Sequence, residues 1–188
     1  MPTDVNSKEI VLNLEKDGEV FVFYGDPDNK APSVTFKSVW APNTTGPGFH
    51  VHTKQQETFY VVSGTMVGRM KGHKDVILGP GESFVVPPGA VHTFYNASKV
   101  EPLETRITLE PALDFQRFIT EMAMVTISKN GSQKDLSLLP ELGYIMWKYR
   151  DEQRIGGMPL FVENMLLGTL VVIAKLTGKA KKIGTRQR

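Results

Sequence analysis

Short hydrophobic runs separated by turn-forming residues cover the chain from about residue 8 to residue 110. Gly25-Asp26-Pro27, Gly79-Pro80-Gly81 and Pro87-Pro88-Gly89 are among the breakers between these runs. Many short strands with such turn signals predict a β-sandwich or barrel. The expected strands cover residues 10–14, 20–24, 34–39, 58–62, 65–70, 83–86, 92–95 and 103–109.

At Pro111 the spacing of hydrophobic residues changes to that of an amphipathic helix. Pro111 suits the first turn of this helix, and Asn130-Gly131 suits its end. A second helical stretch follows around residues 142–149, and a third covers about residues 159–177. The pattern therefore predicts a barrel domain over residues 1–110 and a helical extension over residues 111–188. The apolar faces of the extension are expected to pack on the barrel or on a partner subunit.

The chain has 188 residues, which suits one domain with an appendage. Hydrophobic residues make up 40% and charged residues 22%, which is typical of a globular protein. There is no cysteine. The chain therefore has no disulfide framework, thiolate zinc site, iron–sulfur cluster or cysteine nucleophile.

Charge is unevenly distributed along the chain. The formal net charge is +2, but six basic residues and no acidic residue lie between Lys175 and Arg188, so the preceding 174 residues carry a net charge of −4. An acidic body argues against nucleic-acid binding, which requires a basic face on the fold itself. Because no apolar signal segment opens the sequence, we expect a cytoplasmic protein.

The apolar run from Met165 to Ala174 is the one segment that resembles a membrane anchor. A spanning helix needs ~20 mostly apolar residues, and this run is bounded by Glu163-Asn164 and Lys175. A buried helix is therefore expected, and membrane association is not.

A His-x-His block carries the first candidate chemistry. His50 and His52 point the same way if they lie on one strand. Glu57 follows after a polar turn over residues 53–56, so it can open the next strand and face back towards the histidines. Two imidazoles and a carboxylate from adjacent strands form a ligand set for a first-row metal. A second block, residues 81–96, ends one strand at a Pro-Pro-Gly turn and begins another with His92, which supplies a fourth ligand.

Together the two blocks resemble the cupin signature. The matching positions are His50, His52, Glu57 and Gly64 in the first block and Gly81, Pro87, Gly89, His92 and Asn96 in the second. The leading glycine of the first block departs from the family spacing, since Gly46 and Gly48 precede His50 by four and two residues. The helical extension is similar to that of a group of small cupins.

The resemblance implies a mainly β fold, a cupin-type double-stranded β-helix (jelly-roll) barrel followed by about three helices. It also implies one divalent metal ion, Fe(II), Mn(II), Ni(II) or Zn(II), on His50, His52, Glu57 and His92. Small cupins commonly pair, so a homodimer is expected. The alternative for the four ligands is a metal-free core in which the histidines only pack.

Strand parity places Phe59, Phe84 and Phe94 in the interior beside the ligands, where they become candidate substrate-binding residues. Such a wall suits a largely apolar or aromatic small-molecule substrate, although each phenylalanine is equally explained as barrel core. Arg69 and Arg106 are expected on the outer surface. His73 lies in a polar turn and is given no role.

Three functions are compatible with this site. The favoured one is a metal-dependent oxidoreductase, a dioxygenase acting on a small aromatic or enolic compound. The second is a non-redox isomerase, cyclase or lyase, in which the metal is a Lewis acid and Glu57 or Tyr95 is the catalytic residue that handles the proton. The third is a binding protein without catalysis.

Overall fold

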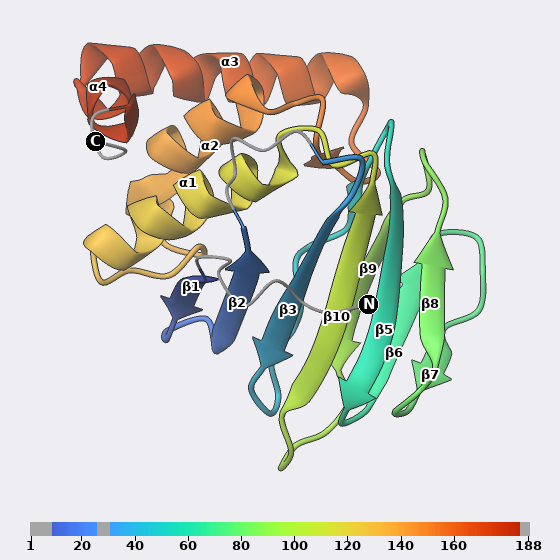
Figure 1. The fold of residues 1–188 in the computed structure, drawn as a ribbon. Helices are drawn as coiled ribbons and strands as arrows, with labels where there is room; N and C mark the ends of the chain where they lie inside the picture. Colours follow the sequence, from blue (N-terminus) through green and yellow to red (C-terminus); the bar gives the residue numbers. More distant parts are fainter. Residues whose placement is uncertain (1–8, 26–30, 185–188) are drawn as a thin grey trace.

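The computed structural model describes residues 9–25 and 31–184. Two antiparallel sheets enclose the core, and the helices gather at one end of them (Figure 1). The first sheet has the order β1 (Glu9–Leu14), β2 (Glu19–Tyr24), β3 (Val34–Trp40), β10 (Leu103–Glu110), β5 (Gln56–Ser63), β8 (Ser83–Val86). The second has the order β11 (Arg154–Ile155), β4 (His50–Val51), β9 (His92–Asn96), β6 (Met66–Met70), β7 (Val76–Leu78).

Alternation of buried and exposed side chains explains why these segments form strands. Along β10 every second residue from Leu103 to Leu109 is buried, while the side chains between them lie nearer the surface. The same alternation in β3 brings Ser38 into the core opposite Thr105, and their hydroxyl oxygens are 2.7 Å apart. This hydrogen bond satisfies the two hydroxyl groups inside the core.

The glycines on either side of the first block of ligands are explained by the backbone around them. Gly64 has a φ of +83°, and a Cβ there would lie 2.4 Å from the carbonyl oxygen of Pro102. At Gly46 a Cβ would lie 2.0 Å from the carbonyl oxygen of Phe94. Both positions therefore need glycine because neighbouring backbone approaches closely.

The helices form layers over one end of the barrel: α1 (Phe115–Ser128), the 3-10 helix η1 (Leu136–Leu138), α2 (Leu139–Lys148), α3 (Leu160–Leu176) and α4 (Lys179–Gly184). The ring of Phe115 on α1 stacks on Phe36 of β3, with centroids 5.7 Å apart. Helix α3 covers α2, and a Cβ on Gly143 would lie 2.5 Å from Leu170 Cδ1. The apolar face of α1 therefore packs on the barrel, one of the two expected arrangements.

The extension also returns to the barrel. Strand β11 pairs with β4, with Ile155 opposite His50. The backbone N–H of Ile155 donates to Glu163 of α3 at 3.0 Å, and Arg154 lies 3.3 Å from the same carboxylate. Residues 154–155 of the extension thus form part of the second sheet.

The mainly β fold with a helical extension agrees with the expectation from the sequence. The eight expected strands are present within a residue or two of their predicted limits. Strands β4, β7 and β11, of two or three residues each, and helix α4 were not predicted. Such elements are too short to produce a recognisable period.

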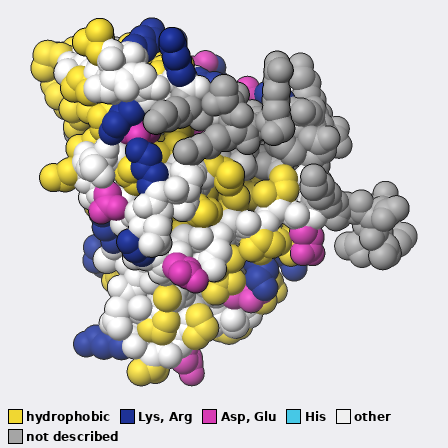
Figure 2. Space-filling view, turned by 90° about the vertical axis from the view of Figure 1, so that its left-hand side faces the viewer, with side chains coloured by type: hydrophobic (Ala, Val, Ile, Leu, Met, Phe, Trp, Pro, Cys, Tyr) yellow, Lys and Arg dark blue, Asp and Glu magenta, His cyan; other side chains and the backbone are white. Residues whose placement is uncertain are grey.

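Helix α3 has an exposed apolar side. Its exposed large apolar residues are Leu160, Phe161, Met165, Leu166, Val172, Ile173 and Leu176. Hydrophobic side chains gather over the helices at the upper left of the space-filling view (Figure 2). No helix within the described ranges combines the length and apolar character needed to cross a membrane. The homodimer stays a prediction, which light scattering over a range of concentrations tests.

Candidate metal centre

The four side chains predicted as metal ligands meet inside the barrel. His50 lies on β4, where the register pairs it with His92 of β9. His52 follows β4 directly, and Glu57 lies on β5 in the other sheet. All four side chains are buried. Strands of both sheets thus contribute to one group of donor atoms.

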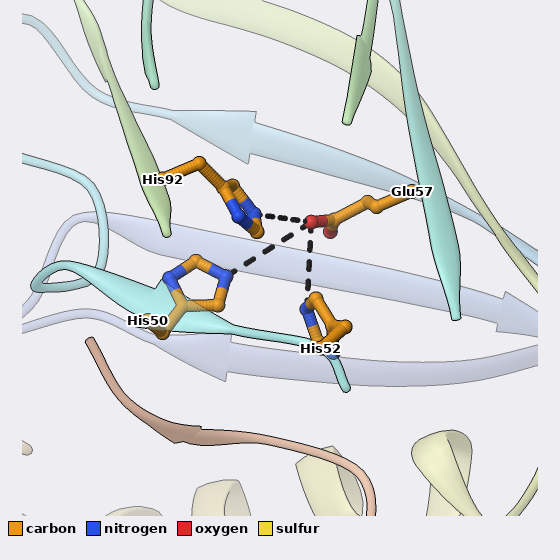
Figure 3. A group of neighbouring side chains, drawn as sticks. All are labelled: His50, His52, Glu57 and His92. Atoms are coloured by element: carbon orange, nitrogen blue, oxygen red, sulfur yellow. Dashed lines mark hydrogen bonds and ion pairs between the residues drawn. The ribbon is translucent and has the colours of Figure 1, made fainter. Parts of the chain in front are cut away.

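The Glu57 carboxylate is the common neighbour of the three imidazoles (Figure 3). Its Oε2 atom lies 2.7 Å from Nε2 of His92, 3.4 Å from Nε2 of His52 and 3.9 Å from Nε2 of His50. One possible ligand atom from each of the four residues lies within 4.8 Å of the others. This donor set is one that first-row divalent cations bind.

Each imidazole is oriented by a backbone carbonyl behind it. The Nδ1 atoms of His50, His52 and His92 lie 3.0, 2.7 and 3.0 Å from the carbonyl oxygens of Gly48, Glu152 and Ala90, respectively. Because Nδ1–H donates to a carbonyl, Nε2 is the nitrogen that faces the group. The Nε2 atom of His52 is buried without a hydrogen-bond partner among the described residues. These residues therefore fit a divalent cation.

The charges within the group favour an ionised carboxylate. Burial alone would raise the pKa of Glu57, but the hydrogen bond with His92 and the nearby imidazole of His52 hold this pKa well below its ordinary value. Burial, assisted by neighbouring His92, lowers the pKa of His50 to about 3. Burial also acts to lower the pKa of His52, but the contact with Glu57 outweighs it and the net shift is upward. A cation at this position would replace protons that otherwise compensate the Glu57 charge.

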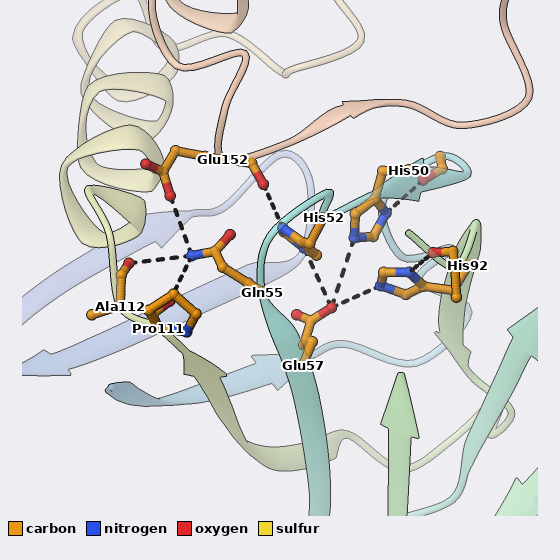
Figure 4. Close-up of polar contacts among 10 residues, drawn as sticks. His50, His52, Gln55, Glu57, His92, Pro111, Ala112 and Glu152 are labelled. Atoms are coloured by element: carbon orange, nitrogen blue, oxygen red, sulfur yellow. Dashed lines mark hydrogen bonds and ion pairs between the residues drawn. The ribbon is translucent and has the colours of Figure 1, made fainter. Parts of the chain in front are cut away.

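A further layer of hydrogen bonds ties the group to the helical extension (Figure 4). Gln55 is buried, and its Nε2 donates to the carbonyl oxygens of Pro111 and Ala112 and to the Glu152 carboxylate, at 3.1, 3.2 and 3.2 Å. The other oxygen of that carboxylate accepts the N–H of Asp114 at 2.9 Å. Glu152 therefore fixes the start of the extension with its side chain and orients His52 with its carbonyl.

A cavity of about 110 Å³ adjoins the group. His50, His52 and Glu57 contribute to its lining, and most of the remaining wall is apolar. The barrel supplies Trp40, Phe94 and Ile107, and α1 supplies Phe115, Phe118 and Met122. Helix α1 thus closes a pocket that begins at the candidate ligands.

Of the three phenylalanines predicted to bind substrate, Phe94 lines this pocket. Phe59 and Phe84 are buried too, but they do not line it. The ring of Phe59 packs against Phe94 with a centroid distance of 4.7 Å and against Phe84 at 5.9 Å. In the structure these two side chains support the wall from behind.

The structure does not bring Tyr95, which was predicted beside Glu57 as a proton-handling residue, to the pocket. Tyr95 alternates with the buried side chains of His92, Phe94 and Asn96 along β9, so it points to the other face of its sheet. Arg69 lies over its ring at 5.0 Å from the centroid. This expectation is corrected by strand parity.

Three other side chains lie where the sequence places them. Arg69 is exposed and forms an ion pair with Asp75 at 2.7 Å, and Arg106 is exposed on β10. His73 is exposed in the turn after β6.

Sequence reasoning missed several residues of the pocket. Glu19, Gln133 and Gln153 line it together with the ligands. A signal for Glu19 was present, because it has the same strand parity as Phe21 and Phe23, which are buried. The glutamines lie in loops, for which no periodic signal exists.

This chain is similar to one family model and to several solved structures. Residues 36–108 match the family model described as Cupin domain. Pac13 from Streptomyces, described as a nucleoside dehydratase, is 21% identical with a TM-score of 0.47, covering 61% of this chain and 88% of that chain. KdgF from Halomonas sp. is 18% identical with a TM-score of 0.48, covering 61% and 96%. An RmlC-like cupin from Shewanella frigidimarina NCIMB 400 is 22% identical with a TM-score of 0.47, covering 61% and 94%. No curated protein matches the sequence.

Proposed function

We propose that this chain, which belongs to the cupin superfamily, is a metal-dependent enzyme acting on a small, largely apolar, aromatic or enolic compound. The observation that carries the proposal is the meeting of His50, His52, Glu57 and His92 at one end of an apolar pocket. A divalent cation on these residues, Fe(II), Mn(II), Ni(II) or Zn(II), would supply a Lewis acid and, if redox-active, a path for electrons between substrate and dioxygen.

The side chains of the pocket indicate the class of substrate. Trp40, Phe94 and Phe115 line the same pocket as the ligands and present apolar surface to it. No lysine or arginine is among the described residues that line the pocket. A phosphate or sulfate ester would therefore lose its hydration without gaining a lysine or arginine to compensate its charge. A flat neutral ring or enol carries no such charge, so its desolvation costs less.

The favoured reaction is oxidation by dioxygen. Protein reconstituted anaerobically with Fe(II) would be mixed with catechol or acetylacetone, as aromatic and enolic probes, in an oxygen electrode. Oxygen uptake that depends on a probe and is lost in His50→Ala supports a dioxygenase-type reaction. Uptake that is equal in wild type and His50→Ala would place the reaction outside the candidate centre and contradict the proposal.

One observation favours a second candidate, a non-redox isomerase, cyclase or lyase. Such reactions require a group that holds or moves a proton, and Glu57 is already occupied as a ligand. Glu19 adds another carboxyl group to the same pocket. Conversion of a substrate under strictly anaerobic conditions by protein loaded with Zn(II) would favour this candidate over the first.

A further inference from the structure

We propose that Glu19 determines which substrates the pocket accepts, by donating a hydrogen bond from its carboxyl group to an oxygen atom of a compound bound at the candidate metal centre. The inference rests on the proposed function, because it assumes that substrate occupies this pocket. Glu19 is not one of the candidate metal ligands, and its strand, β2, contributes none of them.

The placement of Glu19 follows from its strand. Glu19 is the first residue of β2, opposite Trp40 of β3 in the register. Phe21 and Phe23, two and four residues later, are buried in the barrel. Residues two apart on a strand share a face, so the Glu19 side chain leaves the strand towards the interior. It is half-buried there and lines the same cavity as the ligands.

The surroundings of this carboxyl group favour its protonated form. It has no hydrogen-bond partner among the residues that the structure describes. Burial raises the pKa of Glu19 to about 8, and the negative charge of nearby Asp17 adds to the rise, while Lys134 opposes it. Asp17 is held in place, since the backbone N–H of Gln133 donates to it at 2.9 Å.

A protonated carboxyl group adds one O–H donor to a wall that, apart from Gln133 and Gln153, is mainly aromatic and aliphatic. A substrate with a carbonyl, hydroxyl or ether oxygen away from the metal would satisfy this donor, whereas a wholly apolar one would leave it unpaired. Glu19 therefore favours a small compound that carries a second oxygen function beyond the one directed at the metal.

Two probes that share a metal-binding end test this inference on protein loaded with Zn(II), which performs no oxidation. Catechol has only its two adjacent hydroxyl groups, and protocatechualdehyde carries an additional carbonyl oxygen on the ring. Calorimetry gives the dissociation constants of both, and their ratio is the selectivity of each variant. The two probes differ in the acidity of their hydroxyl groups. At a fixed pH this difference changes the selectivity of every variant by the same factor, so it cancels when variants are compared.

At about pH 6.5 we expect the selectivity for protocatechualdehyde to be about 2- to 10-fold higher in wild type than in Glu19→Ala, as one neutral hydrogen bond implies. Glu19→Gln should keep most of it, because the amide is also a donor. At about pH 9.5, above the pKa of Glu19, wild type should lose the preference while Glu19→Gln retains it. Glu15→Ala, an exposed glutamate of the same hairpin, is the matched control and should behave as wild type.

Equal selectivity in wild type, Glu19→Ala and Glu19→Gln at both pH values would overturn the role of Glu19 while leaving the proposed function intact. If Glu19→Ala does not fold, the comparison of wild type with Glu19→Gln at the two pH values decides the question alone. Binding of neither probe, or binding unchanged in His50→Ala, would contradict the proposed function itself, and the inference with it.

Discussion

At the inner end of the pocket, polar side chains of the barrel are buried and each imidazole is held by a hydrogen bond, whereas much of the wall comes from apolar side chains of the helical extension. At the inner end, hydrogen bonds to backbone carbonyls fix the orientation of each imidazole and so direct its Nε2 atom into the group. The wall is held by packing, which tolerates changes of similar volume more readily than a hydrogen-bonded group does. We infer that the barrel supplies the chemistry of the site, and that the apolar wall from the extension acts together with Glu19 of β2 to supply its selectivity.

This division is not complete, because Glu152 belongs to the extension and its carbonyl orients His52. The predictions below test how far the two regions depend on each other.

Removal of residues 159–188 should have the largest effect. It deletes α3 and α4, uncovers the side of α2 around Gly143, and removes Glu163, which holds β11 beside β4. We expect a lower melting temperature and aggregation on purification. Removal of residues 185–188 alone, which lie outside the described residues, is the control. A truncated protein that is monodisperse and melts like the full chain would contradict the prediction.

When cells that express the full-length protein are fractionated, the protein should stay in the soluble fraction. Its recovery with anionic vesicles at physiological salt, together with a well-behaved truncated form, would show that α3 serves membrane binding rather than stability.

Phe118→Ala should cost about 3–5 kcal/mol of unfolding free energy, because it opens a cavity among buried rings. Phe118 is 2% exposed, and its ring lies 5.7 Å from that of Tyr149. Metal content should remain that of wild type if the wall and the centre are separable. Denaturant unfolding measures the first effect and elemental analysis the second, with Met124→Ala on the exposed side of α1 as the control.

Gln55→Leu tests the connection between the two regions. Loss of the hydrogen bonds to Pro111, Ala112 and Glu152 should loosen the segment that orients His52. Changes of this kind typically reduce metal affinity by about 10- to 100-fold. Competition with a chelator measures the affinity. Gln56→Leu, an exposed neighbour, should leave it unchanged, and the same affinity in both variants would argue against the connection.

The smallest expected effect concerns pH and stability. The pKa of Glu19 is raised from 4.5 to about 8 in the folded protein by burial and by Asp17. Between these values the folded state binds a proton that the unfolded state has lost, so this group makes stability fall as pH rises. The melting temperature of Glu19→Gln minus that of wild type should therefore increase from about pH 5 to about pH 8. A difference that is constant over this range would contradict the placement of Glu19.

Much of the fold and the whole ligand group could be predicted from the sequence, because both depend on local patterns. Alternation identified the strands, and the spacing of His50, His52, Glu57 and His92 matched a signature. Tyr95 lies on the opposite face of β9 from His92, as strand parity already indicated. The contacts of Glu152 and Phe118 with the site could not be predicted, because they depend on how the extension folds back over the barrel.

The candidate metal centre is best tested by the metal content of purified wild type, His50→Ala and His92→Ala. We expect one divalent ion per chain in wild type and its loss in both variants, whereas His73→Ala, a change at an exposed histidine, should retain it. Equal metal content in wild type, His50→Ala and His92→Ala would show that these residues do not hold a metal.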